Sequence, residues 1–256
     1  MRQFKFKSAV SLVGALSMTY STAMYAGGVE ISTGTRGPFL SFLGGANWIS
    51  SSQSATSNFG GLTTNLYQVN SSSVAGPFLG VDAGYLWQVA HRYYLLTGVE
   101  TSYTVAKAPY GIVYPLYLLG NFDTLNFNYQ LSSVPLFGLI AFGTKFGLFA
   151  PYVFGGLGVS WNTAENYNEV ATNPDGSALP MRSMFGSNTG ADFAWTVGAG
   201  TVLQIASHSA IRIEYRYTDY GVVCLSPTST QSASQKLKLG AITSNALLIG
   251  LTVAWV

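Results

Sequence analysis

Five charged residues stand in the chain at spacings that could bring them together as acid and base pairs. Two acids, Asp82 and Glu100, lie in the first half, and Arg212, Glu214 and Arg216 occupy alternate positions in the second half. Alternate residues of a β-strand point to the same side of a sheet, so this triplet places two guanidinium groups and a carboxyl group on one face. Side chains of this kind form buried ion pairs, line an ion path or act as general acids and bases.

The other residue types that carry chemistry are few and scattered. His91 and His208 lie in segments that we expect to be short turns, and the single cysteine, Cys224, lies in a long connection. These positions supply neither a close-spaced set of metal ligands nor a Ser/His pair. We therefore expect no catalytic residue, no metal site and no cofactor. Cys224 is interpreted as a small buried apolar residue, with a reactive thiol or an intermolecular disulfide partner as the alternatives.

Eight runs of alternating bulky apolar and small or polar residues must position these charges. They cover residues 38–49, 77–89, 93–106, 125–142, 149–162, 192–206, 210–221 and 245–256. Alternation at period two is typical of strands with one apolar and one polar face. Long connections rich in Ser, Asn, Gly and Thr follow the odd runs, and short ones, at residues 90–92, 143–148 and 207–209, follow the even runs. Such short links join antiparallel neighbours.

The bulky face of these strands is predicted to meet lipid. In the last run Leu247, Ile249 and Leu251 share one parity and oppose smaller residues. The five charged residues named above all fall on the small or polar parity of their runs. An Arg or Lys on the lipid face costs roughly 2–4 kcal/mol at the bilayer midplane, so lipid exposure selects this distribution. A soluble barrel such as a lipocalin would show the reverse arrangement.

The sequence therefore predicts an all-β fold, an eight-stranded antiparallel up-and-down transmembrane β-barrel. Eight strands enclose just enough space for their own side chains, so a wide pore is not expected. We expect small and polar residues to fill the interior and the five charges to form a paired network, with a narrow ion path as the alternative. Pro135 lacks an amide hydrogen and predicts a bulge, or a later start, in the fourth run.

All five tryptophans lie toward the ends of the runs. Trp48, Trp161 and Trp195 lie toward the long connections, whereas Trp87 and Trp255 lie toward the short turns. Tryptophan is enriched at both membrane–water interfaces. These residues are predicted to form two aromatic girdles, one at each interface.

The N-terminus carries a predicted export signal. Three basic residues among the first seven precede an apolar stretch at residues 9–18, and small residues follow, with cleavage expected after Ala26 or Ala23. We expect residues 1–26 to be a signal peptide and residues 27–256 to be a single barrel domain. Removal of the signal changes the balance from 12 basic and 10 acidic residues to 9 and 10. Nucleic acid is therefore not an expected partner.

Two segments resemble a known family. The sequence Arg-Ile-Glu-Tyr-Arg-Tyr-Thr-Asp-Tyr-Gly at residues 212–221 resembles the penultimate strand of small outer-membrane β-barrel proteins related to the OmpA transmembrane domain and to the opacity and surface-antigen proteins. Residues 151–158 resemble their mid-barrel strand. The resemblance implies a place in the outer membrane of a Gram-negative bacterium, with short turns toward the periplasm and long loops outside. The implied partners are outer-membrane lipid, lipopolysaccharide and the outer-membrane assembly machinery.

Function is expected in the four long connections, at residues 50–76, 107–124, 163–191 and 222–244, because loops on a rigid scaffold carry recognition. The second connection is unusually apolar. Its aromatic and aliphatic residues form a candidate recognition loop, which comprises Tyr110, Tyr114, Tyr117 and Leu118. Either this patch contacts a host or cell-surface ligand, or it extends the neighbouring strands or folds over the barrel mouth.

The predicted function is that of a surface protein with a structural or recognition role, similar to an adhesin or a surface antigen. A narrow channel for ions or small solutes is the alternative, and an outer-membrane enzyme that modifies lipid is a third possibility. A packed interior would favour the first prediction, and connected polar voids would favour the second. The third requires a Ser/His pair on the lipid face near the long loops.

Overall fold

The computed structural model describes residues 36–51, 54–59, 63–69, 73–90, 92–114, 124–172, 178–179, 185–227 and 236–255. The predicted signal peptide, His91, Tyr117, Leu118 and Val256 lie outside these residues. Twelve β-strands form within the described ranges. No helix in these ranges is long and apolar enough to cross a membrane.

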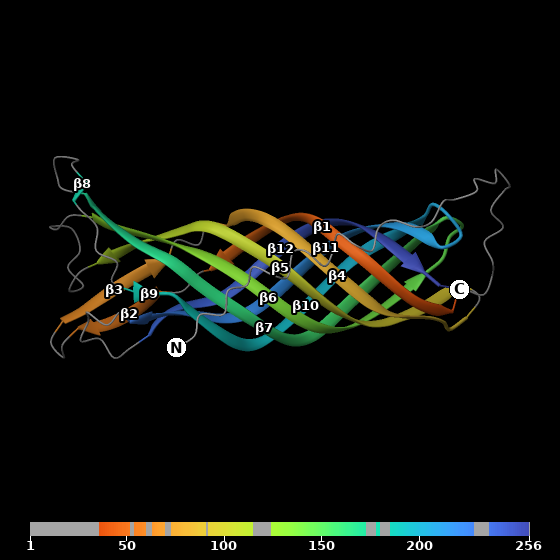
Figure 1. Cartoon of the computed structure of the whole chain (residues 1–256), viewed down its shortest axis with the longest axis horizontal. Helices are drawn as coiled ribbons and strands as arrows, with labels where there is room; N and C mark the ends of the chain where they lie inside the picture. Colours follow the sequence, from red (N-terminus) through yellow and green to blue (C-terminus); the bar gives the residue numbers. More distant parts are fainter. Residues whose placement is uncertain are drawn as a thin grey trace, which may run out of the picture. The chain divides into compact units, whose positions relative to one another are not determined.

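Eight long strands form the wall of a closed barrel. In chain order they are β1 (Gly37–Ser51), β4 (Val74–Gln88), β5 (Tyr93–Tyr114), β6 (Thr124–Thr144), β7 (Phe149–Thr172), β10 (Asn188–Gln204), β11 (Ser209–Pro227) and β12 (Leu237–Ala254). Each strand pairs antiparallel with the next one of this set. β12 also pairs with β1, from Phe39 opposite Ala254 to Ser51 opposite Ile242, and closes the ring. The predicted eight-stranded antiparallel barrel is confirmed (Figure 1).

Four short strands lie at one end of this barrel (Figure 1). We call this end the loop end. They are β2 (Ser54–Phe59), β3 (Thr63–Val69), β8 (Ala178–Leu179) and β9 (Phe185–Gly186). β2 and β3 form a hairpin, and β3 pairs with the last residues of β5. β8 pairs with β7, and β9 pairs with the end of β11. The opposite end, the turn end, carries the tight turns that follow β4, β6 and β10.

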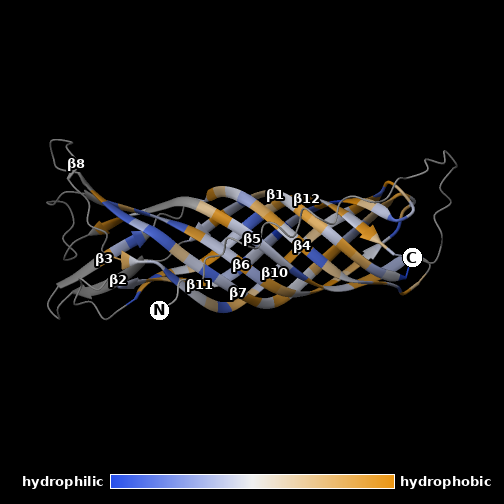
Figure 2. Ribbon diagram, in the orientation of Figure 1, coloured by the Kyte–Doolittle hydropathy of each residue, from blue (hydrophilic) through white to orange (hydrophobic). Residues whose placement is uncertain are grey.

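Large apolar side chains cover the outside of the barrel over its central part. Leu79, Leu157, Phe193 and Ile249 are each at least 59% exposed, whereas inward neighbours such as Leu248 are buried. Figure 2 shows this alternation of hydrophobic and hydrophilic residues along the strands. Exposure of large apolar side chains to water is unfavourable, so this band is suited to contact with lipid.

The wall continues toward the loop end with the opposite pattern. In β6, Phe127, Tyr129 and Leu131 point inward and are buried, and the polar residues Asn126 and Asn128 alternate with them. The prediction of a small and polar interior is therefore wrong for this end of the barrel. Beyond the lipid the outer face meets water, so apolar residues turn inward as in a soluble barrel.

The predicted strand ends at the loop end are wrong for the same reason. β5 runs to Tyr114 and β6 begins at Thr124, so much of residues 107–124, predicted as a loop, is strand. β7 extends to Thr172 and β11 to Pro227. In β7 polar outward residues give the extension the composition of a loop, and its period-two burial pattern shifts by one residue at Asn166, which has a positive φ.

Pro135 causes no bulge, contrary to the prediction. It lies in regular register opposite Ser160 of β7. Its missing amide hydrogen falls on the β5 side, where the pairing skips from Thr101 opposite Leu136 to Thr104 opposite Ser133. The Thr101 hydroxyl donates to the Pro135 carbonyl oxygen at 3.0 Å. This bond satisfies the acceptor, whereas the bond that an amide at position 135 would donate is missing.

Candidate functional site

A network of five charged side chains crosses the barrel interior beneath the lipid-facing band. Arg216 of β11 donates through Nη2 to Glu100 Oε2 at 3.0 Å and through Nη1 to Glu100 Oε1. β11 and β5 have three strands between them on either side of the ring. This pair therefore joins opposite walls. The same Nη2 also donates to Glu214 Oε2 at 2.6 Å.

Arg212 extends the network toward β4. Its Nη1 lies 2.6 Å from Asp82 Oδ2, and its Nε donates to Glu214 Oε1 at 2.7 Å. Nη1 also donates to the Ser41 hydroxyl at 3.3 Å. The carboxylate of Glu214 is thus shared by both arginines. All five charged residues are at most 5% exposed, so the structure brings together every member of the predicted set.

Aromatic residues complete this network, and reasoning from the sequence missed them. The Tyr152 hydroxyl donates to Glu214 Oε1 at 2.5 Å. The Arg216 guanidinium lies 5.3 Å from the ring centroid of Phe78 and 5.1 Å from that of Phe154, so both rings contribute cation–π attraction. Tyr152 and Phe154 lie two residues apart in β7 and therefore share its inward face. This shared parity is the sequence signal that could have identified them.

Two glycines of β10 make room for those rings. A Cβ on Gly198 would lie 2.6 Å from the ring of Phe154, and one on Gly200 would lie 2.6 Å from the Tyr152 hydroxyl. Both positions face the network across the β7–β10 pair. Close approach of the aromatic side chains to the backbone therefore requires glycine at these two positions.

The geometry defines a filled, interlocked core rather than an open path. Two guanidinium groups face three carboxyl groups, which leaves a formal charge of minus one when all are ionised. Buried charges are tolerated only when they are paired and hydrogen-bonded. Loss of one partner would leave an uncompensated charge in the barrel, so these side chains act as one unit.

A layer of hydrogen-bonded polar groups lies between the charges and the loop end. The Asn47 amide donates to the Thr104 hydroxyl, and the Asn162 amide donates to the Tyr220 carbonyl oxygen, each at 2.6 Å. All four residues are buried. Each bond joins two strands that have one other strand between them, so both span part of the barrel interior.

A second barrier, the outer aromatic cluster, seals the barrel at the loop end. It consists of Tyr67 from β3, Phe127 from β6, Tyr167 from β7 and Phe185 from β9. Ring centroids lie 5.3–6.0 Å apart for the four contacts that connect these residues in a circle. All four are buried. The short strands β3 and β9 thus fold inward and supply half of the plug.

The candidate recognition residues do not form one loop. Tyr110 and Tyr114 belong to β5, where Tyr110 lies opposite Asn128 of β6 and Tyr114 opposite Leu66 of β3. Tyr117 and Leu118 lie outside the described residues. Of the two interpretations that the sequence left open, strand extension holds for the first half of this segment.

The predicted girdle tryptophans all lie on the outward parity. Trp48, Trp87, Trp161 and Trp255 are each at least 39% exposed. Trp195 is half-buried because its ring packs on Tyr217, with centroids 5.4 Å apart. Trp87 also donates from Nε1 to the Thr97 hydroxyl at 3.1 Å. Amphipathic rings of this kind suit membrane interfaces.

The remaining reactive residues lie apart from one another. His208 lies in the turn between β10 and β11, at the turn end. Cys224 is a free, half-buried thiol in the extension of β11, opposite Lys238. Within the described ranges, no group of three His, Cys, Asp or Glu side chains is arranged to hold a metal ion.

A closed antiparallel barrel with an apolar outer band and interior charges defines a membrane-spanning β-barrel protein. Residues 8–251 match the outer membrane protein beta-barrel domain family. The chain belongs to this family and is therefore a protein of the Gram-negative outer membrane, as the sequence predicted. Among curated protein sequences, none is significantly similar to it.

Several solved structures are similar to this chain at low sequence identity. Neisserial surface protein A is 14% identical, with 86% of this chain and 99% of that chain covered and a TM-score of 0.41. OprG from Pseudomonas aeruginosa is 17% identical, with coverage of 86% and 96% and a TM-score of 0.43. The outer membrane enzyme PagL is 12% identical, with coverage of 80% and 97% and a TM-score of 0.38. These neighbours include an enzyme, and no activity of this chain follows from the likeness.

Proposed function

We propose that this protein is a surface barrel with a structural or recognition role, and that its contacts with a host or cell-surface ligand are made at the loop end. One observation carries the proposal. The interior is filled at two levels, by the charged network and by the outer aromatic cluster, while the wall extends past the apolar band toward the loop end. Ordered sheet outside the lipid has no use in holding the barrel in a bilayer, but it can present side chains to a partner.

The alternative, a narrow channel, lacks support in the described residues. An ion that crossed the barrel would have to pass Arg216 and Glu100, which join opposite walls, and then the buried rings of Tyr67 and Phe185. Neither barrier opens without loss of several contacts. The charges therefore favour a structural role.

The third possibility, an enzyme that modifies lipid, needs a nucleophile and a base close together on the lipid face near the loop end. In the part of the chain that the structure describes, the one histidine, His208, lies at the turn end. The acids Asp82, Glu100 and Glu214 are buried inside the barrel. This distribution favours a protein without catalytic activity.

The test is a loop exchange in a non-adherent Gram-negative host that displays the protein. Residues 115–123, which include Tyr117 and Leu118, and residues 228–235 are replaced separately by short Gly-Ser links. A matched control carries a Gly-Ser insertion in the turn at residues 145–148, at the opposite end. Folding of each variant is checked by heat-modifiable gel mobility.

The expected result is attachment of the displaying cells to cultured host cells or to immobilised matrix proteins, which at least one loop exchange abolishes and the turn insertion preserves. Equal attachment by the wild type, both loop variants and an empty host would overturn the recognition role. Discrete conductance steps recorded with the purified wild type would favour the channel function over the recognition role.

A further inference from the structure

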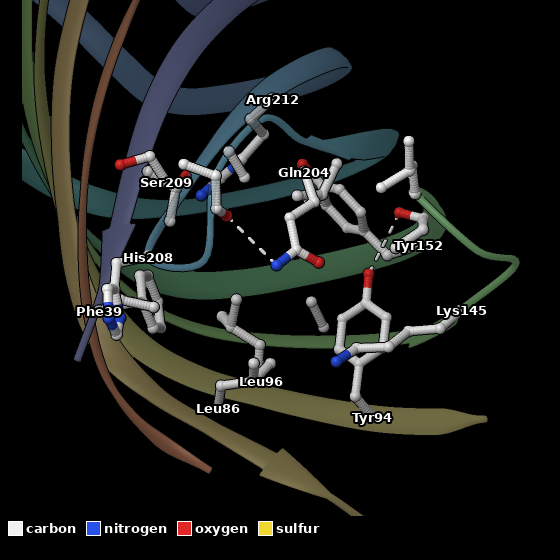
Figure 3. A pocket seen from close by; sticks show the side chains of 18 of the residues that line it. Phe39, Leu86, Tyr94, Leu96, Lys145, Tyr152, Gln204, His208, Ser209 and Arg212 are labelled. Atoms are coloured by element: carbon white, nitrogen blue, oxygen red, sulfur yellow. Dashed lines mark hydrogen bonds between the residues drawn. The ribbon is translucent and has the colours of Figure 1, made fainter. Parts of the chain in front are cut away.

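A cavity of about 130 Å³ lies inside the barrel at the turn end. Figure 3 shows it between the walls, with side chains from several strands directed into it. Its lining includes Leu148 and Ser207 from two of the tight turns, so it reaches the turn end of the barrel. Arg212 lies at its inner limit, where the charged network closes the way toward the loop end. The cavity is a pocket with one mouth.

Apolar side chains from every part of the wall line this pocket. They include Phe39 of β1, Leu86 of β4, Leu96 of β5, Ala141 of β6, Ala150 of β7 and Val202 of β10. An eight-stranded barrel normally has an interior that its own side chains fill. Small inward residues, among them Ala141 and Ala150, leave this space open. An empty cavity lowers stability in proportion to its volume, so an occupant would offset a cost that the sequence otherwise bears.

The size of the pocket limits the ligand to a small apolar group. A dry apolar cavity of about 150 Å³ is large enough to bind benzene. The rings of Tyr94 and Phe154 lie in the same lining, as Figure 3 shows for Tyr94. Ring edges and faces of this kind pack well on an aromatic ligand.

Charge at the two ends of the pocket differs and sets the orientation of a ligand. The network at the inner end holds three carboxyl and two guanidinium groups, so it offers no net positive charge to an anion. Lys145 and His208 lie among the lining residues contributed by the turns. Figure 3 shows the Lys145 amine on the side of the pocket where Tyr94 lies. An anionic head would therefore lie at the mouth, with its apolar part inside.

We infer that this pocket binds a small aromatic or short aliphatic carboxylate from the periplasmic side. The turn end faces the periplasm in outer-membrane barrels. The ring or chain of the ligand fills the space between Leu86, Leu96 and Ala141, and its carboxylate pairs with Lys145. This site is independent of recognition at the loop end.

The experiment measures binding of three fluorinated probes by ¹⁹F NMR to the full barrel in lipid nanodiscs. The probes are 4-fluorobenzoate, the neutral 4-fluorobenzyl alcohol and the cationic 4-fluorobenzylamine. Ala141→Phe fills the pocket, and Ile140→Phe is its matched control because Ile140 faces lipid and is 56% exposed. Ala150→Leu is a second filling variant and serves if Ala141→Phe does not fold. Lys145→Gln removes the charge at the mouth.

The expected result is saturable binding of 4-fluorobenzoate that Ala141→Phe or Ala150→Leu abolishes and Ile140→Phe preserves. Lys145→Gln should weaken the binding of 4-fluorobenzoate by up to about fivefold, the effect expected for loss of a partly solvated ion pair. It should leave the binding of 4-fluorobenzyl alcohol unchanged. Equal signals from wild type and the folded filling variants would mean partition into lipid only and would overturn the site. Binding of the amine as tight as that of the carboxylate would overturn the role of Lys145.

Discussion

Arg216 binds Glu100 through both terminal nitrogens and thereby ties β11 to β5 across the full width of the barrel. Both side chains are almost fully buried. Because the two strands lie on opposite sides of the ring, this single ion pair holds walls that no backbone ladder connects directly. The pairing of β12 with β1 closes the ring, and this ion pair blocks the interior at the level of Glu100.

Removal of one partner of this pair should destabilise the barrel strongly. Arg216→Met leaves Glu100 and Glu214 facing each other without their shared cation, and breaking a buried pair typically costs about 3–5 kcal/mol. Urea-induced unfolding in lipid vesicles, followed by tryptophan fluorescence, measures the change in the free energy of unfolding. Lys238→Met, at an exposed position of the loop end, is the control and should change it by less than about 1 kcal/mol.

Neutralising the second partner should restore part of this loss. The double variant with Arg216→Met and Glu100→Gln removes the uncompensated carboxylate, so its unfolding free energy should exceed that of Arg216→Met alone. If the loss of unfolding free energy in the double variant equals the sum of the losses in Arg216→Met and Glu100→Gln, the two residues are not directly coupled across the barrel.

The outside of β7 at Leu157 should face lipid, whereas the outside of β6 at Asn126, in the extension toward the loop end, should face water. Leu157 is 65% exposed on the outside of β7, and an arginine there should cost roughly 2–4 kcal/mol if it lies near the bilayer midplane. Asn126→Arg, on the exposed polar side of the β6 extension, should cost close to nothing. The two variants are compared by the fraction of protein that folds in vesicles. Equal losses of folded protein would mean that the extension of β6 lies in lipid.

The outer aromatic cluster should act as a packed core although it lies outside the lipid. Truncation of one of its four rings in Phe127→Ala should cost about 3–5 kcal/mol, as in a soluble protein core. Limited proteolysis of the folded barrel should show faster cleavage at the loop end, because Tyr67 and Tyr167 both pack on this ring. Unchanged cleavage would show that β3 is held by other contacts.

Binding of a carboxylate in the turn-end pocket should weaken as pH rises. Burial lowers the pKa of Lys145, so its ammonium loses its proton at a lower pH than an exposed lysine does, and the attraction for an anion is lost with it. The other titratable groups of the lining are Tyr94, Tyr152, His208 and Arg212. A pH titration of 4-fluorobenzoate binding in a His208→Gln background isolates the lysine, and a flat profile up to pH 10 would exclude its part in binding.

The sequence predicted the membrane part of this barrel well because two physical rules act there at once. Period-two alternation marked each of the eight wall strands but none of the short strands β2, β3, β8 and β9. The exclusion of charge from lipid placed Asp82, Glu100 and the Arg212, Glu214 and Arg216 triplet on the inner parity. Tyr152 and Phe154 escaped attention because an aromatic residue on either face of a strand is unremarkable without knowledge of its partner. Their opposite neighbours Gly198 and Gly200 become informative only once the register is known.

The loop end could not be predicted in the same way because its environment changes partway along each strand. Phe127 and Tyr129 keep the inward parity of Phe137, but the outward side chains become polar where lipid gives way to water. A segment such as residues 163–172 of β7 then has the composition of a loop. The insertion of Tyr67 and Phe185 from short strands into the barrel mouth depends on contacts between distant segments, which no local pattern encodes.

Conductance in planar lipid bilayers is the most direct measurement of whether the interior is sealed. Purified mature protein, with folding verified by heat-modifiable gel mobility, is compared with Arg212→Ala and Glu100→Ala. The expected result is a silent bilayer for the wild type and for both variants, because the outer aromatic cluster remains in place when the network is weakened. Discrete current steps in the wild type that either substitution alters would contradict a sealed barrel and make the charged network the lining of a channel.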